Sequence, residues 1–323
     1  MQIAVPVPRA VLHVESRLTR LVVEAGAAGD GAGGAEGLPK ALALALEPVY
    51  RRAAGAGDRA DGFDGVYRHL FSEWGYEGLI EELVSEHPLV VAAVDEIWLG
   101  CAERQGSAGA DLGGPALRQL GISLPAALFL EPEALRLFLR RELLHVEDTL
   151  DPGFGYRPGP LRAGRPGAME NLARDRLRLL WGISVDGRLA RRFPVYEKLR
   201  AERLAQARGM YRSLPDALPE RLVAALWLGS RPRFEELRLQ VCDHERLLEA
   251  YLPEARPEAG AFLPGSPCAL CSFPVARVVV EWESEAERRL ALRIGGDFPT
   301  WRPEFGACER CVEGYAVREG TWL

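Results

Sequence analysis

Four of the six cysteines in the sequence form two Cys-x-x-Cys pairs. Cys268 pairs with Cys271 and Cys308 with Cys311, and 36 residues separate the two pairs. A Cys-x-x-Cys turn places two sulfur atoms at a separation that suits one metal ion, and structural zinc takes four such ligands in a tetrahedron. A redox-active or disulfide-forming dithiol is the alternative, but two pairs around one segment favour metal. We therefore predict one structural Zn²⁺ held by all four side chains.

The segment between the two pairs predicts a β-hairpin. Apolar and β-branched residues form two short runs, 275–282 and 290–294, with charged residues between them. Two Cys-x-x-Cys turns joined through a hairpin resemble a zinc ribbon, and the resemblance covers residues 264–323. It implies a closed all-cysteine site that supports folding and leaves no open position for catalysis. Phe298 and Trp301 nearby would form either a contact surface or the cover of a very small core.

A second motif lies in the sequence RELLH, residues 141–145. It resembles the HExxH helix of zincin metallopeptidases, and the resemblance implies that Glu142 is a general base and His145 a zinc ligand. Arg141 stands where that family has its first histidine, and a guanidinium cannot coordinate zinc. A third ligand would have to come from further along the chain. The candidates are Glu170, Asp175 and Asp186, with His244 as a spare ligand.

Three interpretations of this motif stay open. Glu142 and His145 are a chance i,i+3 pair on a helix, the trace of a zincin that has lost its activity, or part of a working peptidase. A di-iron helical bundle would need a second Glu-x-x-His motif, and the sequence has only this one. His13, His69 and His87 have no partner at metal-binding spacing, so we expect partly exposed or hydrogen-bonded helix residues. Cys101 and Cys242 are expected to be buried thiols in helices.

The rest of the chain predicts a mainly α fold. Apolar residues recur at helical spacing in 38–105, 132–150 and 171–251. Residues 25–37 are almost all Gly and Ala and predict a flexible loop, while four prolines and two glycines in 252–267 predict a linker. We therefore expect a multi-helix domain over residues 1–255 followed by a small β module, the zinc ribbon, over 264–323.

Composition narrows the class of function. The formal net charge is -6, which argues against a general nucleic-acid-binding surface. No run approaches the ~20 apolar residues of a membrane span, so we expect a cytoplasmic protein without membrane contact. The sequence also lacks the GxxxxGK[ST] and GxSxG motifs. The resulting hypothesis is a zinc-binding protein whose helical, zincin-derived domain acts in binding or scaffolding with a protein partner; the alternative is a zinc metallopeptidase that uses RExxH.

Overall fold

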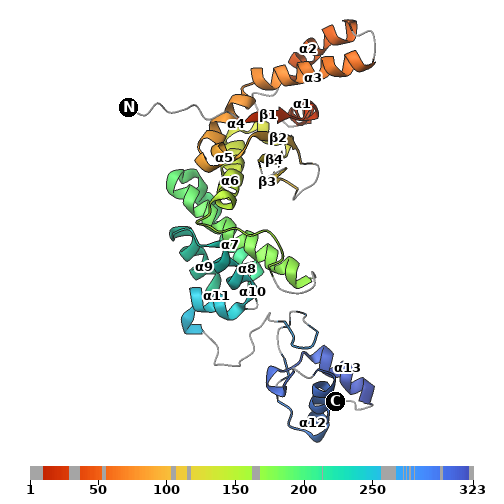
Figure 1. The fold of residues 1–323 in the computed structure, drawn as a ribbon, viewed down its shortest axis with the longest axis vertical. Coiled ribbons are helices and arrows are strands. Elements are labelled where there is room, and N and C mark those ends of the chain that lie inside the picture. The colour runs from red at the N-terminus through yellow and green to blue at the C-terminus, as the bar shows by residue number, and fades with distance from the viewer. Residues whose placement is uncertain are drawn as a thin grey trace. The chain divides into compact units, whose positions relative to one another are not determined.

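The chain divides into two compact units, Met1–Tyr156 and Arg157–Leu323, and is mostly helical (Figure 1). The structure is a computed structural model. It describes residues 10–28, 37–52, 56–102, 107–114, 118–161, 168–212, 214–255, 267–271, 273, 275, 278–279, 281–298 and 301–319. The helical class that the sequence predicts is confirmed, but a four-stranded sheet that it did not predict lies in the first unit.

The first unit combines helices with short strands. Its elements are β1 (Val11–Val14), α1 (Ser16–Ala28), α2 (Leu38–Arg52), α3 (Ala56–Glu73), α4 (Tyr76–Ser85), α5 (Pro88–Ala93), β2 (Glu96–Cys101), β3 (Gly109–Gly113), β4 (Gln119–Leu124), the 3₁₀ helix η2 (Ala126–Leu130) and α6 (Pro132–Leu150). Residues 25–28 of the expected Gly/Ala loop belong to α1, and residues 29–36 lie outside the described residues.

The sheet has the strand order β1-β2-β4-β3. β2 is parallel to both β1 and β4, while β3 runs antiparallel to β4 at the edge. One face of the sheet is buried, since Ile97, Leu120 and Ile122 are at most 4% exposed and share a core with α1, α4, α5 and α6. The prediction of helices throughout residues 38–105 is therefore wrong for Glu96–Cys101, which form β2. The strands are only four to six residues long, and Gly100 and Gly121 interrupt their apolar pattern.

Helices make up the first part of the second unit. They are α7 (Ala168–Arg192), η3 (Pro194–Lys198), α8 (Leu199–Met210), α9 (Leu218–Leu228), α10 (Phe234–Cys242), α11 (His244–Tyr251) and η4 (Pro253–Ala255). The long helix α7 contacts α8, α9 and α10. These segments match the helices expected from the apolar spacing, with one break at Asp243, whose side chain caps α11.

The C-terminal module contains the helices α12 (Glu285–Asp297) and α13 (Glu309–Glu319), with η5 (Pro303–Phe305) between them. The prediction of a hairpin is wrong in its second strand, because residues 290–294 lie in α12. Leu290 and Ile294 are buried one turn apart, whereas Leu292 is 78% exposed on the other side of the helix. In the first of the two predicted strands, residues 275–282, Val279 forms an isolated β-bridge with Ala307. Residues 256–266 lie outside the described residues, so a domain boundary there stays a prediction.

Candidate metal centre

The two cysteine pairs are held in different ways. Cys268 and Cys271 flank a turn, in which the Cys268 N–H donates to the Phe273 carbonyl at 2.8 Å. Cys308 directly precedes α13, and Cys311 lies in the first turn of that helix, where its N–H donates to the Cys308 carbonyl at 2.9 Å. The second pair is thus set by the start of a helix, which fixes the spacing of both sulfur atoms.

A short backbone bridge brings the two pairs together. The Val279 N–H donates to the Ala307 carbonyl at 2.8 Å, and the Ala307 N–H donates back at 3.1 Å. Since Ala307 precedes Cys308 directly, this exchange holds the second pair beside the segment that follows the first pair. The Cys308 N–H also lies 3.3 Å from the Cys268 Sγ, which links the pairs directly.

The four sulfur atoms form one cluster. All four Sγ atoms lie within 4.8 Å of one another, and those of Cys271 and Cys308 are 3.7 Å apart. A tetrahedron of thiolates at about 2.3 Å from a central zinc ion has an edge of about 3.8 Å. A disulfide would instead place two sulfur atoms at about 2 Å, and all four cysteines are free thiols here. The Cys271–Cys308 separation matches that edge, and the group as a whole is compact enough to hold one metal ion.

The electrostatic surroundings differ from one thiol to the next. Burial by itself raises the pKa of Cys268, but backbone N–H donors, among them those of Leu270 and Cys308, outweigh it and lower that pKa to about 7. Burial and the neighbouring thiols raise the pKa of Cys308 and Cys311. A divalent cation at the centre of the cluster would favour the thiolate form of every member, because its charge compensates the negative sulfur atoms.

Two tryptophans fix the loop that leads into the second pair. Trp301 is 6% exposed, and its Nε1 donates to the Gly306 carbonyl at 2.9 Å. Trp282 packs edge-on against it, with ring centroids 5.7 Å apart, and donates to the Pro303 carbonyl at 3.2 Å. Gly306 has a φ of 64°, a backbone conformation that favours glycine. Trp301 therefore belongs to the small core and not to a contact surface, while Phe298 is 38% exposed.

Glu142 and His145 lie on α6 in the first unit, as predicted from the motif. The Arg141 guanidinium lies beside Glu142, with its Nη2 3.2 Å from the Glu142 Oε1, and the Glu142 side chain is 14% exposed. The His145 carbonyl accepts a hydrogen bond from the Thr149 hydroxyl at 3.0 Å. The proposed base is thus paired with the residue that replaces the first histidine of the zincin motif.

The candidate third ligands belong to the second unit and have cationic partners there. Asp186 is fully buried, and its Oδ2 accepts from the Arg203 Nε at 2.6 Å. Glu170 pairs with Arg174 and Asp175 with Arg178, each at 2.9 Å, and His244 is a buried residue at the start of α11. Among the described residues, the four cysteines are the one group of three or more potential metal ligands close enough to share an ion. The roles of Glu142 and His145 stay predictions.

The isolated histidines and cysteines agree only in part with what the sequence suggested. His13 lies on β1, not on a helix, and its ring stacks on Trp98. His87 is buried at the start of α5 and is hydrogen-bonded, as expected, because its Nδ1 lies 2.9 Å from the Glu147 carboxylate. His87 and Glu147 are 60 residues apart in the sequence, so no local pattern indicated that they would pair. Cys101 ends a strand, and both it and Cys242 are only partly buried.

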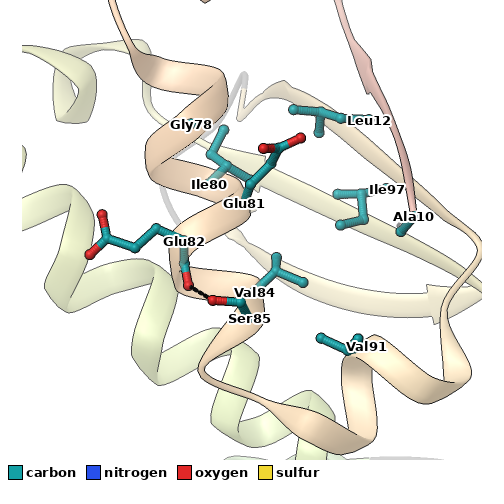
Figure 2. Close-up of a pocket in the computed structure, with 10 residues that line it drawn as sticks. All are labelled: Ala10, Leu12, Gly78, Ile80, Glu81, Glu82, Val84, Ser85, Val91 and Ile97. Carbon is teal, nitrogen blue, oxygen red and sulfur yellow. Dashed lines mark hydrogen bonds between the residues drawn. The ribbon is translucent and has the colours of Figure 1, made fainter. Parts of the chain in front are cut away.

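A cavity of about 340 Å³ lies in the first unit between α4, α5 and the strands β1 and β2 (Figure 2). Its lining consists of Ala10, Leu12, Gly78, Ile80, Glu81, Glu82, Val84, Ser85, Val91 and Ile97. The walls are mainly apolar, and the Glu82 side chain points away from the cavity (Figure 2), toward Arg136, which pairs with it at 2.9 Å. Sequence reasoning missed this cavity because two of its walls are the strands that it did not predict.

No protein-family model matches the sequence, and no curated protein or solved structure matches it either. Within the described residues, no helix combines the length and the apolar character that a membrane crossing requires.

Proposed function

We propose that the four-cysteine cluster is a structural zinc site and that the protein acts in the cytoplasm by binding a protein partner. The observation that carries the proposal is the mutual approach of four sulfur atoms to within 4.8 Å, on a turn and a helix start that are linked by a backbone bridge. Zinc fits this donor set because four thiolates at tetrahedral spacing are its preferred structural ligands.

The donor set favours a role in folding over a role in catalysis. Four thiolates fill a tetrahedral shell and leave no position for a substrate or an activated water. The module needs such support because its buried core is small, comprising Leu290, Ala291, Ile294, Trp301, Ala307, Val312 and Ala316. Domains with so little apolar core gain much of their stability from a bound metal.

The peptidase alternative gains no observation in its favour. A general base has to reach a metal-bound water, whereas the Glu142 carboxylate is paired with the Arg141 guanidinium. Glu142→Gln tests this alternative directly. If purified protein hydrolyses a casein substrate and the substitution abolishes that hydrolysis, the peptidase mechanism replaces the binding role.

Metal analysis tests the proposed zinc site. We expect one zinc per chain by elemental mass spectrometry, and loss of that zinc in the double variant Cys268→Ser, Cys308→Ser. The double variant Cys101→Ser, Cys242→Ser is the matched control, because it removes two thiols that lie outside the cluster. It should keep the full zinc content. Wild-type protein without zinc, zinc that survives in the first variant, or iron in place of zinc would each contradict the proposal.

A further inference from the structure

One face of the four-stranded sheet is open in the part of the chain that the structure describes. Val11 is 56% exposed and Trp98 is 50% exposed on this face, and Gly121 and Asp111 are exposed as well. Sheets built from parallel strands are usually covered on both faces, but here the buried side chains lie on the opposite face. An open face on a largely parallel sheet indicates a surface that a partner covers.

The register aligns four residues across this face. His13 is paired with Trp98, Trp98 with Gly121, and Gly121 with Asp111, so one row crosses all four strands. The His13 and Trp98 rings are stacked, with centroids 4.2 Å apart and planes inclined by 15°. The Trp98 Nε1 also donates to the Glu96 Oε2 at 3.1 Å, which fixes the orientation of the indole.

A slot lies over Gly121. His13 covers the indole face that is turned toward β1, so the other face is turned toward β4. The residue of β4 at this position is Gly121, and a Cβ added there would meet only the Asp111 carbonyl oxygen, at 3.8 Å. The floor of the slot is therefore bare backbone, with the indole on one side and the Asp111 side chain on the other.

The width and the charge of the slot suit a planar cation. Neighbouring strands lie about 4.8 Å apart, so the backbones that carry Trp98 and Asp111 are about 10 Å apart. That span accommodates one planar group between an aromatic face and a carboxylate. A guanidinium stacks on an indole and donates to a carboxylate along its edge. Asp111 has no cationic partner among the described residues, in contrast to Asp95, which pairs with Arg118.

We propose that this slot receives an arginine side chain of a partner protein. A free guanidinium compound would be contacted on only three sides, by the Trp98 indole, the Gly121 backbone and Asp111, because the slot is open to solvent. A protein surface that carries an arginine would also cover the exposed side chains of Val11 and Trp98, and burial of that apolar area adds to the affinity. The proposal deepens the binding role proposed above but does not depend on the zinc site, which lies in the other unit.

Peptide titration tests the slot on the full-length, metal-loaded chain. The probe is acetyl-Gly-Gly-Arg-Gly-Gly-amide, and its twin with lysine in place of arginine has the same charge. Binding is followed through the indole N–H resonance of Trp98, which is assigned by its loss in Trp98→Phe. We expect the arginine peptide to bind roughly threefold or more tightly than the lysine peptide, since an ammonium neither stacks as a plane nor donates in two parallel bonds.

Three variants separate the slot from general electrostatic attraction. Gly121→Val fills the slot, keeps every charge and suits a strand, so it should abolish the difference between the two peptides. Asp111→Asn should weaken arginine binding about two- to fivefold. Asp61→Asn is the matched control, because it removes an exposed carboxylate on α3 and should leave the binding unchanged.

Three results would overturn the proposal. Equal binding of the two peptides, or unchanged binding in Gly121→Val, would show that no slot exists, while the zinc result would be unaffected. Sedimentation of the wild type alone provides the third result. A dimer that Gly121→Val dissociates would show that a second copy of this chain occupies the face, and not a different partner protein.

Discussion

At the scale of single residues, two tyrosines of the second unit differ in one hydrogen bond. Tyr211 is 1% exposed, and its hydroxyl has no hydrogen-bond partner among the described residues. The Arg176 guanidinium lies over its ring, 5.6 Å from the centroid. The Tyr251 hydroxyl, in contrast, donates to the Gln240 side-chain oxygen at 2.9 Å. An unpaired buried hydroxyl costs stability, whereas a paired one contributes.

This difference predicts unequal effects for the same substitution at the two positions. Tyr211→Phe should leave the free energy of unfolding within about 0.5 kcal/mol of the wild type or raise it, because no hydrogen bond is lost. Tyr251→Phe should lower it by about 1 kcal/mol. Urea denaturation at pH 7 measures both. If Tyr211→Phe lowered the free energy of unfolding as much as Tyr251→Phe does, the Tyr211 hydroxyl would have to be hydrogen-bonded.

The same two phenols predict a loss of stability in alkali. Burial raises the pKa of both Tyr211 and Tyr251 above the usual value. The folded state therefore retains these protons at pH values at which the unfolded chain has lost them. Their contribution to stability is fully present below about pH 10 and is lost as the pH rises above it. Tyr211→Phe should reduce the fall in the free energy of unfolding between pH 9.5 and 11, and an unchanged fall would contradict the assignment.

At the scale of elements, Gly187 sets the distance between two helices. A Cβ at this position of α7 would lie 2.6 Å from the Cα of Trp227 in α9, which is closer than any real contact. Arg191, which also belongs to α7, holds the backbone of α9 as well, because its side chain donates to the Trp227 carbonyl at 2.7 Å. The two helices can approach this closely only because residue 187 has no side chain.

Gly187→Ala should therefore lower the free energy of unfolding by about 1–3 kcal/mol, despite the better helix propensity of alanine. Gly209→Ala in α8 is the matched control, because a Cβ there meets nothing within 4 Å. It should be neutral or stabilising by up to about 1 kcal/mol. Denaturant titration followed by circular dichroism compares the two variants. Equal free energies of unfolding for the two variants would show that α7 and α9 can move apart without loss of stability.

The sequence predicted helices better than strands, for physical reasons that single elements show. Long amphipathic segments such as α6 and α7 carry their own periodic signal. The strands of the first unit are short, and a glycine breaks both β2 and β4, so their burial becomes evident only once they pair. Residues 290–294 of α12 were mistaken for a strand because Leu290, Leu292 and Ile294 alternate with other residues. Ser284 and Glu287 indicate a helix start in the sequence, since they form a capping box at the beginning of α12.

At the scale of the whole molecule, the two units have separate cores. The core of the first unit comprises residues of its sheet and helices, and a second core belongs to the module with the four cysteines. The four cysteines that could hold a metal ion come from two local motifs, so sequence reasoning predicted that they would lie together. The row across the open sheet face and the cavity depend on pairing between strands that are far apart in the sequence, and no local pattern predicts such pairing.

Metal removal should therefore act on one part of the chain. A ligand that binds only the folded state adds its binding free energy to the stability of that state. Treatment with a zinc chelator should speed amide hydrogen exchange at least about tenfold in α12 and α13, because their small core loses its cross-link. Exchange in β2 and β4 should stay the same. Mass spectrometry of peptides from both regions makes the comparison, and unchanged exchange in α13 would argue against a structural metal.

If the cluster binds a metal ion as proposed, the spacing of its two cysteine pairs sets the order of events in folding. Each Cys-x-x-Cys pair is local, so an unfolded chain can capture a metal with two sulfur atoms at once. Completion of the site has to close a loop of 36 residues, at an entropic cost of roughly 3 kcal/mol. Formation of α12 and of the Val279–Ala307 bridge shortens that search. Metal capture should thus proceed in two kinetic phases, the first independent of folding and the second as slow as the folding of the module.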